Sequence, residues 1–164
     1  MKIVVVGTRG IPDIQGGVET HCEELYPRLA AMGHDVTVVR RSCYITPQNK
    51  IKEYRGVHLK DIYAPRRKSI EAIVHTFLAI IYARWVGADV LHIHAIGPAL
   101  LTPLARLLGL RVVMTHHGPD YDRQKWNKTA KSVLRWGERM GANYANEVIV
   151  ISTVIDNILR EKYD

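Results

Sequence analysis

Short aliphatic runs alternate along the chain with longer segments in which apolar residues recur every three or four positions. Residues 3–6 and 148–151 are apolar at successive positions, which is typical of parallel strands covered by helices on both faces. Residues 18–32 instead place apolar side chains at helical spacing. This alternation predicts an α/β domain with a doubly wound, Rossmann-like parallel sheet.

The same pattern predicts the individual elements, and it contains no internal repeat or low-complexity linker. Strands are predicted at 2–6, 35–40, 57–62, 89–94, 111–115 and 148–151. Helices are predicted at 18–32, from Ser69 to about 85, at 100–108, from 127 or 129 to 141, and at 155–163. Gly33 stands where a left-handed helix cap is expected, and Ser69 and Ser152 are expected N-caps. We therefore expect residues 1–164 to form a single domain.

Composition and charge indicate the kind of partner that this protein binds, but they do not identify it. The 164 residues are 47% hydrophobic and 24% charged, with a net charge of +7. That charge favours an anionic partner, which could be nucleic acid, an acidic membrane surface or a phosphorylated small molecule. The two cysteines do not form a disulfide framework, and Cys22 lies on the apolar face of a predicted helix. We expect a cytoplasmic protein without a transmembrane helix.

The loop between the first strand and the first helix is rich in glycine. Gly16 and Gly17 carry no side chains, and the helix that follows presents unpaired amides and the positive end of its dipole. This combination favours a bound phosphate, although a simple tight turn would use the same residues. Arg9 is a possible second phosphate contact, with a solvated loop arginine as the alternative.

Two other phosphate-binding motifs fit less well. Gly7 and Gly16 are nine residues apart, which is longer than the dinucleotide fingerprint, and no Gly-Lys-Ser/Thr follows as in a Walker A loop. Arg40 and Arg41 end the second strand and would suit a 2′-phosphate, so an NADP-dependent enzyme remains an alternative. A basic nucleic-acid-binding module ranks third, because no recognition motif accompanies the charge.

Histidines are expected at the carboxyl edge of the sheet. His92 and His94 alternate on one strand, while His116 and His117 end the strand predicted beside it. A zinc site would need three or four convergent ligands with second-shell partners, and the spacing shows neither a Cys pair nor a His-x-His-x-Asp-His arrangement. We therefore expect no metal and no cofactor. His116 is expected to turn away and pack, and His21, His34, His58 and His75 are expected to have structural roles.

A basic stripe lies along one side of the helix predicted after residue 127. It comprises Lys128, Lys131, Arg135 and Arg139. The stripe could rest on anionic lipid, with Trp126 and Trp136 at the interface, or it could be an ordinary solvated face. Arg66–Lys68, next to the apolar helix that ends near residue 85, is a second candidate for membrane contact.

Several motifs together resemble a known family. The opening Gly16-Gly17-Val18-Glu19, the turn Gly33-His34-Asp35, the strand end Thr115-His116-His117-Gly118 and the segment 145–152 are similar, in this order, to family 4 glycosyltransferases. These are retaining enzymes of the two-domain GT-B fold. Residues 7–12 and the region of Trp126 look more specifically like bacterial polysaccharide enzymes related to rhamnosyltransferases.

The resemblance implies roles for particular residues. Gly16 and Gly17 would lie against the diphosphate of a nucleotide sugar, and His117 would face the reacting sugar and the acceptor. A neutral imidazole there could hydrogen-bond the sugar or accept the acceptor proton. The candidate acceptor-binding residues are His94, Asp120, Arg123 and Lys125.

The resemblance also implies a domain organisation. This chain corresponds to the N-terminal, acceptor-side half of a GT-B enzyme, whereas the C-terminal domain grips the nucleotide sugar. Because the chain ends at Asp164, we expect that domain to be missing, and the chain alone to fold but transfer no sugar. The expected activity of the complete enzyme is hexosyl transfer to a lipid-linked saccharide in bacterial surface polysaccharide or capsule synthesis. It would occur in the cytoplasm, with peripheral attachment to the inner face of the membrane left open.

Overall fold

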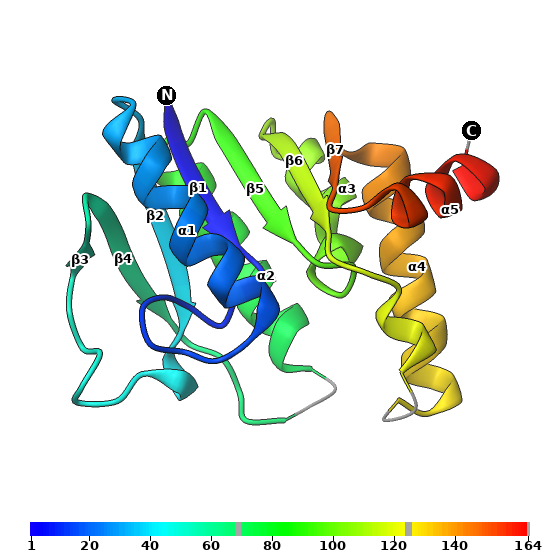
Figure 1. Cartoon of the computed structure of the whole chain (residues 1–164), viewed down its shortest axis with the longest axis horizontal. Helices are drawn as coiled ribbons and strands as arrows, with labels where there is room; N and C mark the ends of the chain where they lie inside the picture. The colour runs from blue at the N-terminus through cyan, green and yellow to red at the C-terminus, as the bar shows by residue number, and fades with distance from the viewer. Residues whose placement is uncertain (68–69, 124–125, 164) are drawn as a thin grey trace.

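A twisted sheet runs through the middle of the molecule (Figure 1). The structure is a computed structural model that describes residues 1–67, 70–123 and 126–163. Within these residues the sheet has seven strands in the order β3-β4-β2-β1-β5-β6-β7. The strands are β1 Lys2–Val6, β2 Asp35–Arg41, β3 Glu53–Tyr54, β4 Val57–Ile62, β5 Val90–His94, β6 Arg111–His116 and β7 Glu147–Val150. All neighbouring pairs are parallel except β3 with β4, which confirms the predicted α/β class.

The described residues also form five α-helices and three short 3₁₀ turns. The helices are α1 Gly17–Ala31, α2 Glu71–Trp85, α3 Thr102–Leu107, α4 Lys128–Tyr144 and α5 Thr153–Tyr163. The 3₁₀ turns are η1 Ser42–Tyr44, η2 Pro98–Leu101 and η3 Asp120–Asp122. The helix predicted at 100–108 is therefore split, because a 3₁₀ turn starting at Pro98 precedes α3. A predicted cap, Ser69, lies outside the described residues.

Local signals explain several element boundaries. The Asn127 side chain accepts a hydrogen bond from the Ala130 amide at 2.8 Å and caps α4. Ser152 Oγ accepts one from the Ile155 amide at 3.2 Å, as predicted for the start of α5. Arg55 and Gly56 both have positive φ, the geometry of a two-residue hairpin turn. That turn produces β3, which the hydrophobic pattern did not predict.

Both faces of the sheet are buried, as the successive apolar positions indicated. Val4 and Val6 belong to a core shared with α2, α3 and α4, whereas Ile3 and Val5 belong to a second core beneath α1. Cys22 lies in that second core with no exposed surface, which confirms its predicted position. The alternation along β1 therefore divides the helices between two layers (Figure 1).

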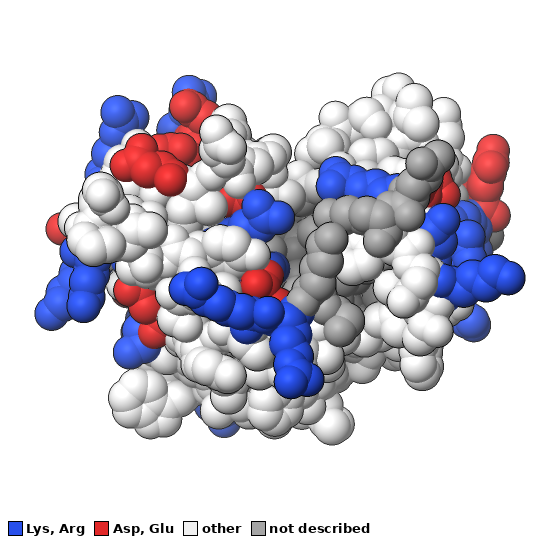
Figure 2. Space-filling model, turned by 90° about the horizontal axis from the view of Figure 1, so that it is seen from below, with Lys and Arg blue, Asp and Glu red and all other residues white. Residues whose placement is uncertain are grey.

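The parallel strands all end at one edge of the sheet, and the loops that follow them gather there. Figure 2 looks onto this edge and shows Lys and Arg side chains in the middle of the face. Ligands of open α/β sheets bind at this edge, so the site is sought here. Among the described residues, no helix has the length and apolar character needed to cross a membrane.

Candidate functional site

A cleft of about 550 Å³ lies at the carboxyl edge, between the N-terminus of α1 and the loops that follow β5 and β6. The predicted site residues that line it are Arg9, Gly16, Gly17, His117, Asp120 and Arg123. His21, Arg41 and Tyr44 also line it, and the sequence did not single them out for this site. Lys125 lies outside the described residues. The structure thus gathers most of the predicted residues around one cavity.

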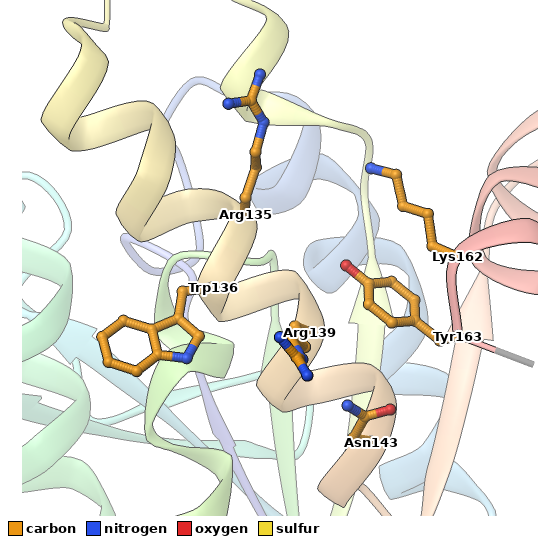
Figure 3. A pocket seen from close by; sticks show the side chains of 6 residues that line it. All are labelled: Arg135, Trp136, Arg139, Asn143, Lys162 and Tyr163. Carbon is orange, nitrogen blue, oxygen red and sulfur yellow. The ribbon is translucent and has the colours of Figure 1, made fainter.

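A second hollow, of about 660 Å³, lies on the flank of the molecule between α4 and α5 (Figure 3). Its lining residues are Arg135, Trp136, Arg139, Asn143, Lys162 and Tyr163. None of the strand-end residues contributes to it. We therefore take the smaller cleft at the strand ends as the candidate active site.

The glycine loop needs its glycines for two separate reasons. Gly7 has φ +99° and Gly16 has φ +147°, and both conformations disfavour side chains. A Cβ on Gly7 would meet the backbone of His94, and one on Gly16 would meet the carboxylate of Glu19. Gly17 instead has open space around it. Because no side chain caps α1, its first amides remain accessible to a ligand in the cleft.

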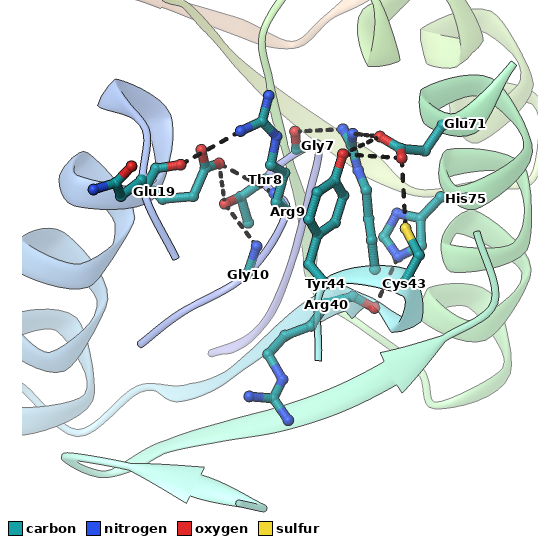
Figure 4. Close-up of polar contacts among 12 residues, drawn as sticks. Gly7, Thr8, Arg9, Gly10, Glu19, Arg40, Cys43, Tyr44, Glu71 and His75 are labelled. Carbon is teal, nitrogen blue, oxygen red and sulfur yellow. Dashed lines mark hydrogen bonds and ion pairs between the residues drawn. The ribbon is translucent and has the colours of Figure 1, made fainter. Parts of the chain in front are cut away.

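Glu19 holds the loop in place from inside α1 (Figure 4). Its carboxylate accepts hydrogen bonds from Thr8 Oγ1 at 2.8 Å and from the Arg9 amide at 3.1 Å. Thr8 Oγ1 in turn accepts one from the Gly10 amide at 3.2 Å. Glu19 is only 5% exposed, so its function in the Gly16-Gly17-Val18-Glu19 motif is to shape the loop, a role that the sequence did not reveal.

Two arginines beside the loop behave differently. Arg41 is held by Glu71 at 2.7 Å and by the Gly7 carbonyl at 3.0 Å. Arg9 is exposed, with its guanidinium 5.3 Å from the centre of the Tyr44 ring and a long hydrogen bond of 3.4 Å to the Gln15 carbonyl. Arg9 is therefore the loop arginine with freedom to contact an anion.

The alternative NADP site loses its support in the structure. Arg40 has no exposed surface, and it binds Asp61 at 2.6 Å and the Asn49 carbonyl at 2.8 Å. Arg40 is therefore not available to a 2′-phosphate, and the Arg41 guanidinium is already held by Glu71 and the Gly7 carbonyl.

His117 is linked to a chain of buried polar groups. Its Nε2 shares a hydrogen bond with Nδ1 of His94 at 2.9 Å, and Nε2 of His94 shares one with the Tyr26 hydroxyl at 2.5 Å. The same hydroxyl lies 2.6 Å from Nδ1 of His92, whose Nε2 lies 2.6 Å from Thr115 Oγ1. The chain runs from the core beneath α1 to the wall of the cleft.

The environment keeps these imidazoles neutral. Burial lowers the pKa of His117 to about 4, with further lowering by His21 and His116. Burial likewise lowers the pKa of His92 to about 3 and that of His94 well below its ordinary value. Near pH 7, His117 is therefore an uncharged ring that can donate one hydrogen bond and accept another.

His94 does not occupy the place predicted for it. Its side chain has no exposed surface, and both ring nitrogens are engaged by Tyr26 and His117. It does not line the cleft, so it is not positioned to bind an acceptor directly. It lies behind His117 and supports that ring from the core.

His21, for which the sequence predicts only a structural role, lines the cleft beside His117. It projects from α1 toward the strand ends, with ring centres 5.0 Å from His117 and 5.7 Å from His94. Ligand nitrogens of these three residues all lie within 4.8 Å of one another, close enough to hold a metal ion. Sequence spacing gave no signal for this, because α1 reaches β5 and β6 only through the fold.

His116 turns to the opposite face, as predicted. Its Nε2 lies 2.7 Å from the Glu138 carboxylate on α4. Glu138 has no exposed surface and also binds Tyr121, Lys162 and Tyr163. This buried cluster connects β6, η3, α4 and α5 directly behind the loop that carries His117.

The predicted basic stripe is on the surface of α4. Lys128, Arg135 and Arg139 are exposed and Lys131 is partly buried. The Arg135 guanidinium stacks 5.2 Å from the centre of the Tyr121 ring. Trp136 is 60% exposed and lies beside Arg139 in the flank hollow (Figure 3).

Comparison with known proteins identifies the family of this chain. The model of the family described as Glycosyltransferase Family 4 matches residues 15–164. The chain therefore belongs to glycosyltransferase family 4. No curated protein matches the chain by sequence at a significant level.

Solved structures agree on the fold. A sucrose-phosphate synthase from Thermosynechococcus elongatus aligns with a TM-score of 0.76 and 20% identity over 98% of this chain and 45% of that chain. A second structure of that synthase aligns with a TM-score of 0.67 and 19% identity, and the alignment covers 99% of this chain and 82% of that chain. UDP-GlcNAc 2-epimerase from Methanocaldococcus jannaschii aligns with a TM-score of 0.57 and 13% identity, over 100% of this chain and 43% of that chain. This chain thus spans less than half of the first structure, and the similarity establishes the Rossmann-like half of a GT-B architecture.

Proposed function

We propose that this chain is the acceptor-side domain of a retaining glycosyltransferase that moves a hexosyl group from a nucleotide sugar to a saccharide acceptor. The main support is the position of His117, a neutral imidazole that lines the same cleft as the uncapped N-terminus of α1. The anionic diphosphate of the donor and the reacting hydroxyl group of the acceptor would then meet in this cleft. Family membership supports the same reaction class.

In this proposal the residues of the cleft have different roles. The amides at Gly16 and Gly17, together with Arg9, receive the donor diphosphate. The bond between the anomeric carbon and the diphosphate breaks, with the electron pair leaving on the phosphate, and a bond forms from the acceptor oxygen. The acceptor proton passes to His117, or to the departing phosphate while His117 hydrogen-bonds the reacting sugar. Asp120 and Arg123 line the acceptor side.

The proposed reaction uses no metal ion or other cofactor. It does require a second α/β domain, which in the GT-B organisation holds the nucleotide sugar. The chain covers 45% of the synthase chain with the same fold, which supports this organisation. We accordingly infer that the 164-residue chain alone has very weak affinity for UDP- or dTDP-sugars and no transferase activity.

The substrate class follows from the narrower resemblance noted in the sequence. Similarity of residues 7–12 to enzymes related to rhamnosyltransferases supports a role in bacterial surface polysaccharide or capsule assembly, with a lipid-linked acceptor. The basic α4 stripe supports a position on the cytoplasmic face of the membrane, where it would meet anionic lipid.

Liposome flotation tests the membrane contact. At low salt the intact protein should float with anionic vesicles and remain unbound with neutral ones, because each basic side chain contributes about 1 kcal/mol near an anionic surface. Replacing Lys128, Arg135 and Arg139 together by Gln should abolish flotation. Equal flotation of the triple variant would refute the role of this stripe.

A ligand panel tests the reaction class. The full-length protein is titrated with UDP-, dTDP- and GDP-sugars and, in parallel, with NADPH. We expect binding of at least one nucleotide sugar and none of NADPH, since Arg40 and Arg41 are already paired. Binding of NADPH without any nucleotide sugar would overturn the proposal, as would salt-sensitive binding of generic DNA alone.

A further inference from the structure

Three histidines from three different elements converge beside the cleft. His21 comes from α1, His94 ends β5 and His117 follows β6. The facing nitrogens of His94 and His117 are 2.9 Å apart, and the three ligand nitrogens lie within 4.8 Å of one another. In a tetrahedral zinc site, with Zn–N distances of about 2.0–2.1 Å, ligand nitrogens are about 3.3 Å apart. The His94–His117 pair is close to that spacing, and the distances to the partly buried His21, which are at most 4.8 Å, would shorten when a metal binds.

The groups behind His94 form a second shell of the kind that a metal-bound histidine needs. Metal-bound histidines nearly always donate their other N–H to an oxygen or a carboxylate. With a metal on Nδ1 of His94, its Nε2–H donates to the Tyr26 hydroxyl. That hydroxyl then donates to Nδ1 of His92, and Nε2–H of His92 donates to Thr115 Oγ1. Every buried group in this chain keeps a hydrogen-bond partner.

The cleft supplies the open position that a metal site of this kind needs. His21 and His117 line the cleft, from which a solvent molecule can supply the fourth ligand. Three neutral imidazoles and one water match the ligand set of an open zinc site.

We propose that His21, His94 and His117 form a binding site for a transition-metal dication of the Zn²⁺ type. The site does not depend on the proposed transfer reaction, which needs no metal. If that reaction is correct, an ion held by His117 removes this ring from its role in transfer. The metal would then act as an inhibitor.

Metal binding by the chain itself provides the test, with any affinity tag removed. Zn²⁺ is titrated in competition with a chromophoric chelator, and Co²⁺ is added separately to record its visible bands. We expect one Zn²⁺ per chain and the intense Co²⁺ bands of a tetrahedral site. His21→Ala and His117→Ala should each weaken Zn²⁺ binding at least 10-fold, whereas His58→Ala, at an exposed position on β4, should leave it unchanged.

Tyr26→Phe serves as a second readout, because it leaves all three ligands in place. Losing a second-shell partner typically lowers metal affinity by about 10–100-fold. Thermal unfolding of each variant verifies that it is folded. The proposal is overturned if the wild-type chain binds no Zn²⁺, or if His21→Ala and His117→Ala bind it as tightly as the wild type. Equal weakening by His58→Ala would also overturn it.

Discussion

His117 depends on residues that never reach the cleft. Its Nε2 is bound to His94, which is bound to Tyr26, so the chain of hydrogen bonds decides which ring nitrogen of His117 carries the proton. Each neutral imidazole donates a hydrogen bond from one ring nitrogen and accepts one at the other. The Tyr26 hydroxyl has a single proton, so it donates to one of His92 and His94 and accepts from the other. The sequence showed the histidines but not this order, because Tyr26 lies on α1, far from them in the chain.

Tyr26→Phe should therefore disturb His117 without touching it. We expect two histidine tautomers in exchange where the wild type has one, and a fall in stability of about 1–3 kcal/mol from the unpaired nitrogens. Nitrogen-15 NMR of the labelled chain identifies the histidine tautomers, and urea unfolding measures the free energy of unfolding. Tyr54→Phe, which removes only a hydrogen bond to Glu23, is the control. An unchanged His117 signal in Tyr26→Phe would contradict this account.

Neighbouring glycines in the loop should respond differently to alanine. Gly16→Ala places a side chain at φ +147° and against Glu19, so we expect a loss of roughly 1–3 kcal/mol. Gly17→Ala should change stability by less than about 0.5 kcal/mol, because its Cβ meets nothing. In the full-length protein Gly17→Ala should still raise the KM for a nucleotide sugar. Equal urea midpoints for the two variants would show that the conformational role assigned to Gly16 is wrong.

Helices and strands were largely predictable because burial on both sides of a parallel sheet leaves a clear pattern. The strands β1, β2, β5 and β6 follow from their apolar runs, and α5 follows from Ser152. The short β3 and the divided helix at 98–107 depend on turn geometry, which the pattern does not encode. The cleft was predicted in part for the same reason. Loop positions follow from strand ends, whereas the partners of Glu19, His94 and Glu138 arise only from packing.

Glu138 on α4 connects this helix to β6, η3 and α5. Burial alone would raise its pKa, but hydrogen bonds from His116, Tyr163 and Lys162 outweigh that effect and lower it to about 2. Glu138→Gln removes the charge that these donors face, so we expect a loss of roughly 3 kcal/mol and weaker docking of α5. Glu147→Gln, at an exposed position on β7, is the control. Equal urea midpoints for these two variants would refute the importance of the cluster.

The molecule as a whole should lose stability in mild acid. The pKa values of His75 and His117 are lowered to about 4 and that of His92 to about 3, whereas unfolded histidines titrate near pH 6.5. Between these values the unfolded chain binds more protons, so the free energy of unfolding falls as the pH falls from about 6.5 toward 4. Glu138 adds a further loss between about pH 4.5 and 2.

Urea unfolding between pH 7.5 and 4 measures this dependence. The midpoint should be steady above about pH 7 and should decline progressively below pH 6.5. A midpoint that stays constant from pH 7.5 to 5 would mean that the buried histidines are charged or exposed, and it would remove the basis for a neutral His117.

The proposed contribution of His117 to sugar transfer is tested most directly by the rate of transfer by the full-length protein with and without that side chain. Product formation from a panel of nucleotide sugars is measured for the wild type, His117→Ala and His58→Ala. We predict transfer from at least one donor, a fall of about 10²–10⁴-fold in His117→Ala and no change in His58→Ala. Near-normal turnover by His117→Ala would contradict the account.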